Sequence, residues 1–112
     1  MSGELLGVPV IDGHSLSREQ IAKHGKDRYP TAELNALKLC AEAGELADAL
    51  LKHHHGAYGG RCTSPCQHAI HAEIRHELAD TGLALYALCN KLGLNLTEVM
   101  AELVDGDRRD FR

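Results

Sequence analysis

Two pairs of acidic residues stand out in this chain by type and spacing. Glu42 and Glu45 lie three residues apart within "CAEAGELADALL", and Glu77 and Asp80 repeat that spacing within "HELAD". Side chains three residues apart share one face of a helix, where like charges repel. If the two helices pack against each other, the four carboxylates form one cluster whose burial requires a cation or hydrogen-bond donors. Oxygen ligands suit Mg²⁺ or Mn²⁺, and Mg²⁺ commonly binds carboxylates together with substrate phosphates, so the pattern indicates phosphate chemistry.

Two long helices are expected to carry these acids. Thr31 has the side chain of a helix N-cap, and Gly56 lies where that first long helix would end, after a run of histidines. Ser64 followed by proline predicts the start of a second long helix, which would run to Lys91 with Gly93 just beyond its end. An antiparallel pair of this kind would bring the acids together.

Two short helices are expected to flank the long pair. Ser17 with Gln20 has the spacing of a capping box and predicts a short first helix, while Asn95 with Glu98 predicts a last helix that ends before Gly106. No alternating apolar pattern is long enough to predict a strand, so the expected fold class is all-α, a four-helix bundle with two long antiparallel helices and two short ones. The chain divides accordingly into an extended N-terminal arm (1–16), an all-α domain (17–105) and a loose C-terminal tail (106–112).

The helix that carries Glu42 is expected to be amphipathic. Glu42 and Glu45 lie on a stripe with Lys38, and a solvated face with a Lys38–Glu42 ion pair is the alternative to a metal site. The remaining arc of this helix is apolar and is expected to form the core. Its residues are Ala36, Leu37, Leu39, Cys40, Ala43, Leu46, Ala47, Leu50 and Leu51.

The second long helix changes the balance between these alternatives. From Leu78 to Cys89 it is apolar on nearly every side, which predicts that protein surrounds it. Glu77 and Asp80 then point toward packed atoms rather than open water, which favours the metal site. A four-helix chain of this length leaves apolar helix surface uncovered, so self-association is expected.

Composition and charge bound the class of protein. The 112 residues suffice for one domain with a modest core, and 44% hydrophobic with 25% charged residues is ordinary for a globular chain. The net charge of −4 argues against a nucleic acid partner. No apolar run approaches the roughly 20 residues of a membrane span, and "MSGELLGVPV" lacks the features of a signal peptide. The expected location is the cytoplasm, with no membrane partner.

The segment between the long helices is rich in histidine and cysteine. The candidate ligands of a zinc site there are Cys62, Cys66, His68 and His71. The Cys-x-x-x-Cys spacing also fits ordinary thiols beside exposed histidines, which is the simpler interpretation. Cys40 and Cys89 lie on apolar faces and are expected in the core. Glu73 and His76 have the Glu-x-x-His spacing of di-iron bundles, but such sites use two of these elements and the chain has one.

The segments "EAGELADAL" and "HELADTGLALYALCNKLGLNL" resemble the MazG-like, all-α nucleoside triphosphate pyrophosphohydrolase superfamily, whose members carry EExxE on one helix and ExxD on the next. The resemblance covers roughly residues 31–104. It implies that Glu42, Glu45, Glu77 and Asp80 are both the catalytic residues and the Mg²⁺ ligands. It also implies a MazG-type bundle completed by self-association, as a homodimer or homotetramer whose nucleotide site is partly completed by a neighbouring chain.

The activity implied by this resemblance is Mg²⁺-dependent hydrolysis of a nucleoside triphosphate, such as dUTP, dCTP or a damaged nucleotide, to the monophosphate and pyrophosphate. The candidate phosphate-binding residues are Lys38, Lys52 and Lys91, with Arg75 or the Arg108 and Arg109 pair as further possible sources of positive charge. The chain departs from the family pattern at Ala41, where members have another acid, and at Glu102 and Gly106, where members often have lysine and asparagine. Two alternatives stay open: a phosphoribosyl-ATP pyrophosphohydrolase, and a catalytically silent helical dimer that binds nucleotide or a protein partner.

Overall fold

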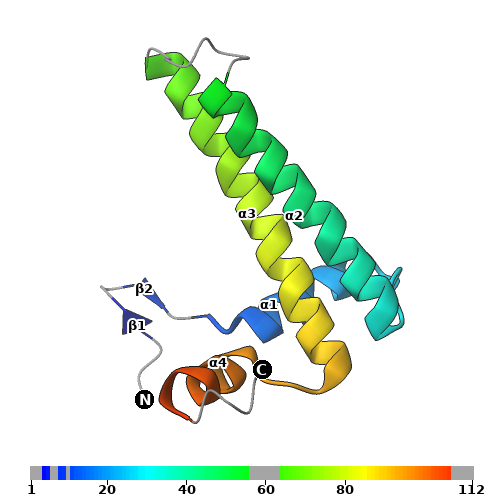
Figure 1. Ribbon diagram of the computed structural model, residues 1–112. Helices are drawn as coiled ribbons and strands as arrows, with labels where there is room; N and C mark the ends of the chain where they lie inside the picture. Colours follow the sequence, from blue (N-terminus) through cyan, green and yellow to red (C-terminus); the bar gives the residue numbers. More distant parts are fainter. Residues whose placement is uncertain (1–3, 6–7, 10, 56–63, 107–112) are drawn as a thin grey trace.

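Two long antiparallel helices packed side by side form the body of the molecule (Figure 1). The structure, a computed structural model, describes residues 4–5, 8–9, 11–55 and 64–106, and for residues 4–5, 8–9, 53–55 and 64–71 it describes the backbone alone. In chain order the elements are β1 (Glu4–Leu5), β2 (Val8–Pro9), α1 (Gly13–Lys23), α2 (Ala32–His55), α3 (Ser64–Leu92) and α4 (Leu96–Asp105). The two strands form a short antiparallel ladder. Apart from this ladder the regular secondary structure of the described residues is helical, which confirms the predicted all-α fold class.

The long helices begin and end close to the predicted positions. Leu34 N–H donates a hydrogen bond to Thr31 Oγ1 over 3.2 Å, which satisfies one of the amides left free at a helix start. α3 starts at Ser64 and ends one residue past Lys91. Gly93 follows with a φ of 70°, in the left-handed region that favours glycine at a helix end. The expected terminator of α2, Gly56, lies outside the described residues.

The first helix starts earlier than predicted. Asp12 is its N-cap, because the Asp12 side chain accepts a hydrogen bond from His14 N–H over 3.1 Å. Residues 13–16, which we expected in the extended arm, are therefore helical. Ser17 is not a cap: it is 1% exposed, and its hydroxyl donates to the Leu83 carbonyl oxygen on α3 over 3.3 Å. The spacing of a capping box was misleading here because a tertiary partner uses the Ser17 hydroxyl instead.

His14 joins α1 to α3 and to the start of α4. Its Nδ1 lies 2.6 Å from Asn90 Oδ1, and Leu96 N–H donates to its Nε2 over 3.0 Å. Because Nε2 accepts a hydrogen bond, Nδ1 is the ring nitrogen that can donate to Asn90 Oδ1. Tyr86 packs edge-on against the ring, with the centroids 4.8 Å apart. This buried network fixes α1 across one end of α3 (Figure 1).

The last helix matches its prediction at both ends. Glu98 N–H donates to Asn95 Oδ1 over 3.0 Å, and the helix ends at Asp105. Its apolar side chains remain largely open to solvent, with Val104 65% exposed and Met100 48% exposed. None of the described helices is long and apolar enough to cross a membrane.

The packed face of α2 differs from the predicted one. Its buried residues, within the part whose side chains are described, are Asn35, Glu42 and Ala49, spaced seven apart. A seven-residue spacing keeps side chains on one face of a helix along its length. The apolar arc is divided: Leu37 is 67% and Leu51 56% exposed, whereas Ala36, Leu39 and Leu46 are half-buried. The expectation that this arc forms the core of the single chain is therefore wrong for its exposed residues, which are Leu37, Cys40, Ala43, Ala47, Leu50 and Leu51.

The predictions that Cys40, Cys89 and α3 are buried are confirmed only in part. Cys40 belongs to the apolar arc and is exposed, so its expected place in the core is wrong. Cys89 is buried as predicted, and burial raises the pKa of its thiol. Most of α3 after Glu77 is half-buried rather than enclosed, and Leu78 is 53% exposed. The described helices of one chain cover α3 on only part of its circumference.

Candidate active site

Three of the four predicted acids converge between α2 and α3. One carboxylate oxygen each of Glu42, Glu45 and Glu77 lies within 4.8 Å of the others. Asp80, one helical turn further along α3, forms a second group of the same kind with Glu77 and His76. Glu77 belongs to both groups, so the four predicted acids form one continuous patch across the two helices.

Glu42 and Glu77 each bury a carboxylate oxygen without a partner. Glu42 is 7% exposed, and its Oε1 lies 2.9 Å from Lys38 Nζ. Its Oε2 and the Oε2 of Glu77 are buried and accept no hydrogen bond from any described residue. Such oxygens are energetically unfavourable unless a donor or cation reaches them. They fit a bound divalent cation, and a donor set of carboxylates is the one that Mg²⁺ or Mn²⁺ prefers.

Repulsion among the acids raises the pKa of Glu45. The negative charge of Glu42 is the main cause that raises the pKa of Glu45 above its ordinary range, loss of solvation is the next, and the charges of Glu77 and Asp80 add to it. Lys38 shifts in the direction of a stabilised cation, because its hydrogen bond to Glu42 raises the pKa of the ammonium group. One lysine thus faces several carboxylates and leaves the site with excess negative charge.

Thr81 fixes the two acid-bearing turns relative to each other. Its Oγ1 lies 2.8 Å from the carbonyl oxygen of Glu77 and 3.1 Å from the carbonyl oxygen of Glu42. A hydroxyl donates one proton, so the two carbonyls share it. The contact with Glu42 crosses from α3 to α2, which sets the register of the helices at the acids. The sequence pattern gave no reason to single out Thr81 beyond its place next to Asp80.

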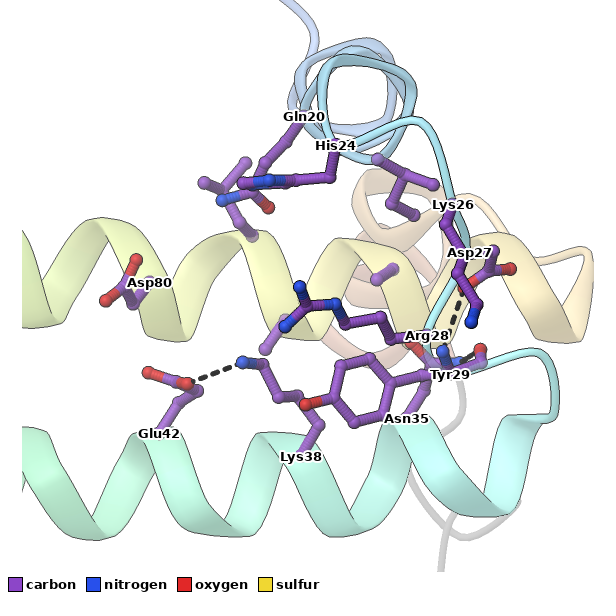
Figure 2. Close-up of a pocket in the computed structure, with 14 residues that line it drawn as sticks. Gln20, His24, Lys26, Asp27, Arg28, Tyr29, Asn35, Lys38, Glu42 and Asp80 are labelled. Carbon is purple, nitrogen blue, oxygen red and sulfur yellow. Dashed lines mark hydrogen bonds and ion pairs between the residues drawn. The ribbon is translucent and has the colours of Figure 1, made fainter.

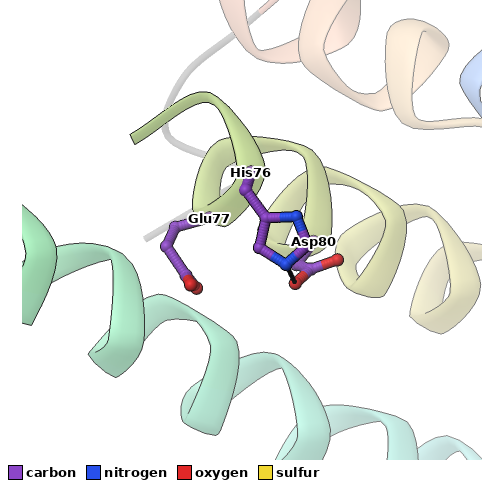
Figure 3. A group of neighbouring side chains, drawn as sticks. All are labelled: His76, Glu77 and Asp80. Carbon is purple, nitrogen blue, oxygen red and sulfur yellow. Dashed lines mark ion pairs between the residues drawn. The ribbon is translucent and has the colours of Figure 1, made fainter. Parts of the chain in front are cut away.

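His76 lies beside the acids through its contact with Asp80. Its Nε2 is 3.1 Å from Asp80 Oδ2 (Figure 3), a contact that follows from their spacing of four residues on α3. The His76 side chain is 71% exposed, so this contact is at the edge of the site. The groups of potential metal ligands among the described residues contain one histidine, which gives no support to a di-iron site with two Glu-x-x-His elements.

A pocket of about 220 Å³ opens beside the acids (Figure 2). It lies between α1, α2, α3 and the connector that joins α1 to α2. Glu42 and Asp80 line its acidic end, whereas Lys26 and Arg28 approach it from the connector, with Lys38 in between. Its apolar wall is formed by Leu83, Ala84 and Ala87 of α3. Neither Lys26 nor Arg28 was among the predicted phosphate-binding residues, although both stand in "KDRYP" between the first two helices.

Of the three predicted phosphate-binding lysines, Lys38 lines this pocket. Lys52 lies 3.9 Å from Glu73, in an ion pair between α2 and α3. Lys91 lies 2.6 Å from Asp27, and its hydrogen bond is the main cause that lowers the pKa of that carboxyl. Neither Lys52 nor Lys91 lines the pocket, and both take part in ion pairs within the chain.

The positions that depart from the family pattern lie outside the acid cluster. Ala41 is exposed on α2. Glu102 is exposed on α4, and its carbonyl oxygen accepts a hydrogen bond from Gly106 N–H over 2.8 Å. The convergence of Glu42, Glu45 and Glu77 therefore does not depend on any of the three.

The predicted zinc ligands lie outside the residues whose side chains the structure describes. They are Cys62, Cys66, His68 and His71. The zinc site stays a prediction.

The chain matches a known protein family. A family model described as phosphoribosyl-ATP pyrophosphohydrolase matches residues 15–106, which is more than half of the chain and includes all four acids. The chain belongs to the phosphoribosyl-ATP pyrophosphohydrolase family. Comparisons of this chain with curated proteins and with solved structures found no match.

Membership in the phosphoribosyl-ATP pyrophosphohydrolase family confirms the grouping with MazG-like, all-α pyrophosphohydrolases. It makes the protein a pyrophosphohydrolase, a hydrolase that acts on acid anhydrides. Enzymes of this superfamily generally use divalent metals, and the acid cluster between α2 and α3 is the part of the described chain that suits one.

Proposed function

We propose that the protein hydrolyses the anhydride bond next to the α phosphate of a nucleoside 5′-triphosphate and releases the monophosphate and pyrophosphate. The proposed Mg²⁺ ligands are Glu42, Glu45, Glu77 and Asp80. One observation carries the proposal: carboxylates from two helices converge, with two buried oxygens that lack a partner, beside a pocket that also holds cationic side chains. This is the combination of charges that a complex of metal and polyphosphate needs.

The chain's own residues divide the work by their exposure. A divalent cation, when bound, neutralises phosphate charge and lowers the pKa of a water molecule. Glu42 and Glu77, with their buried oxygens, would hold the cation. Glu45 is exposed, so it is the carboxylate that can accept the proton of the attacking water. The water oxygen forms a bond to the α phosphorus. The bond between that phosphorus and the oxygen bridging to the β phosphorus breaks, and pyrophosphate leaves with the electron pair of that bond.

Two substrate classes share this bond. Nucleoside triphosphates such as dUTP, dCTP or damaged nucleotides are the first, and the MazG-like grouping supports them. Phosphoribosyl-ATP is the second, and the description of the matched family favours it. Both are nucleotides that are cleaved next to the α phosphate, so the roles of Glu42, Glu45 and Glu77 are the same in either case.

A pyrophosphate-release assay with both substrate classes tests the proposal. We expect Mg²⁺-dependent turnover of at least one of them by the unaltered protein. Glu45→Gln and Asp80→Asn should each lower kcat by about 100-fold or more, the scale of a lost general base or metal ligand. Glu33→Gln removes an exposed acid from the first turn of α2 and is the matched control.

The outcomes of that assay separate the alternatives. Circular dichroism of each variant shows whether the helices survive the substitution. Turnover by folded Glu45→Gln or Asp80→Asn at the rate of the unaltered protein contradicts the assigned site. An unaltered protein that binds Mg²⁺ but turns over no nucleotide supports the catalytically silent module instead.

A further inference from the structure

The pocket beside the acid cluster carries opposite charges at its two ends. Glu42 and Asp80 lie at one end, and Lys26 lies at the other end, where the connector between α1 and α2 passes (Figure 2). The Arg28 side chain reaches from the connector past Tyr29 into the middle of the pocket, so its guanidinium group lies beside the amine of Lys38. A ligand that fills the pocket therefore meets carboxylates at one end and the guanidinium group of Arg28 between that end and the connector.

The other cations near the pocket are already engaged. Lys38 pairs with Glu42 and lies 5.2 Å from the centre of the Tyr29 ring. Lys91 is bound to Asp27. Lys26 and Arg28, in contrast, have no ion-pair partner within the part of the chain that the structure describes. Two positive charges at the mouth of a pocket without acidic partners are the physical requirement for binding an anion.

The backbone on both sides of Arg28 is held in place. Asn35 is buried, and its amide donates to the carbonyl oxygen of Tyr29 over 2.6 Å and to that of Thr31 over 2.7 Å. On the preceding side, Tyr29 N–H donates to Asp27 Oδ1 over 3.0 Å, and the other oxygen of Asp27 binds Lys91 on α3. The connector thus presents Arg28 from an anchored turn, so little ordering of the backbone is needed when an anion binds.

We propose that Arg28, assisted by Lys26, binds a phosphate group of the nucleotide in this pocket, between the acid cluster and the connector, and thereby selects the substrate. The inference rests on the proposed function. A guanidinium group binds a phosphate through two parallel hydrogen bonds, which lysine does not reproduce. The phosphate has two possible sources: the terminal phosphates of a nucleoside triphosphate, or the phosphate of the phosphoribosyl group in phosphoribosyl-ATP.

The test compares Arg28→Gln and Arg28→Lys with the unaltered protein. Calorimetry with Mg²⁺ measures the binding of inorganic tripolyphosphate and of phosphoribosyl-ATP, and steady-state kinetics measures KM and kcat for ATP, dUTP and phosphoribosyl-ATP. Arg28→Gln should weaken binding or raise KM about 10- to 100-fold for the ligand that supplies the phosphate, because it loses a charge-assisted hydrogen bond. Arg28→Lys should fall between Arg28→Gln and the unaltered protein.

Arg75→Gln is the matched control, since Arg75 is exposed on α3 and does not line the pocket. Weaker tripolyphosphate binding and a raised KM for both triphosphates identify the terminal phosphates as the source. An effect confined to phosphoribosyl-ATP identifies the phosphoribosyl phosphate. Binding of both calorimetric ligands by Arg28→Gln as tight as by the unaltered protein overturns the inference.

The same design keeps the two proposals apart. If the unaltered protein turns over no nucleotide, the proposed function fails, but calorimetry still decides whether Arg28 binds phosphate. If turnover is normal and the Arg28 variants match the Arg75→Gln control in every measurement, the proposed function stands and the role of Arg28 is rejected.

Discussion

The two carboxylate oxygens of Glu42 differ in their surroundings. One pairs with Lys38, and the other is buried without a hydrogen-bond donor from any described residue. The negative charge of Glu42 is also the main cause that raises the pKa of its neighbour Glu45. Without a cation the cluster is therefore repulsive, and the fold that holds it together gives up stability to do so. A divalent cation should stabilise the protein because it binds this arrangement in the folded chain and not in the unfolded one.

Thr81 gives a test of the site at the scale of one hydroxyl. Thr81→Val keeps the side-chain shape but removes the hydrogen bond shared by the carbonyls of Glu77 and Glu42. We expect the free energy of unfolding to fall by about 1 kcal/mol and the affinity for Mg²⁺ to fall with it, because the acid-bearing turns lose their shared contact. Urea unfolding and metal titration measure the two effects.

Thr97→Val on α4 is the control for this substitution, since Thr97 is exposed and far along the chain from the acids. If Thr81→Val keeps the Mg²⁺ affinity of the unaltered protein, the hydroxyl does not set the register of the cluster.

At the scale of helices, what could be predicted from the sequence was what local chemistry determines. Thr31 and Asn95 cap their helices as expected because the bonds they accept come from amides three residues away. Ser17 failed as a cap because its partner, Leu83, is 66 residues distant in the chain. The apolar arc of α2 failed as a core for a related reason: periodicity shows that two faces differ, but not which face meets α3.

Some residues of the candidate site could likewise be predicted from the sequence, and others could not. Glu42, Glu45 and Glu77 were found because paired acids on helices are visible as a pattern in the sequence. Arg28 and Thr81 were not, because one lies on an irregular connector and the other acts through backbone carbonyls of two helices. Residues that contribute through tertiary contacts leave no periodic pattern in the sequence.

The connector that presents Arg28 is tied to α3 by the Asp27–Lys91 pair, and this tie predicts a pH dependence. The fold lowers the pKa of Asp27, so ionised Asp27 contributes stability at pH values above its ordinary pKa of about 3.9. That contribution is lost as the pH falls from there through the lowered pKa of the folded state. Asp27→Asn should therefore be less stable than the unaltered protein at neutral pH, and the difference should shrink in acid.

Urea unfolding of both proteins between neutral pH and pH values below 3.9 measures this difference. Lys23→Met removes an exposed ion pair with Glu19 on α1 and serves as the control. A stability difference between Asp27→Asn and the unaltered protein that is the same at all these pH values would show that the pair does not anchor the connector.

At the scale of the whole molecule, the described chain leaves much apolar surface open. Among the residues whose side chains are described, three apolar residues and four polar ones are buried. The back of α2, opposite the acid stripe, exposes Leu37, Cys40 and Leu51. Apolar surface of this extent on one helix face is typical of an interface, so we expect a second copy of the chain to cover it.

Leu37→Glu tests that expectation because it places a charge on the exposed apolar face. We expect the unaltered protein to be a dimer or a larger homo-oligomer by sedimentation equilibrium, and Leu37→Glu to shift it toward the monomer. Thr97→Glu adds the same charge to an exposed position of α4 and should leave the assembly unchanged. A monomeric unaltered protein would remove this interpretation of the exposed leucines.

We expect the carboxylates between α2 and α3 to bind a divalent cation and to direct hydrolysis to the bond next to the α phosphate. Phosphorus NMR of a nucleoside triphosphate or phosphoribosyl-ATP, incubated with the protein and Mg²⁺, tests both expectations because it identifies every phosphorus product. We predict the monophosphate and pyrophosphate as products of the unaltered protein, no conversion when EDTA is added, and conversion slowed about 100-fold or more when Glu45 is replaced by glutamine. Orthophosphate and a nucleoside diphosphate as products, or conversion by Glu45→Gln at the rate of the unaltered protein, would contradict this assignment.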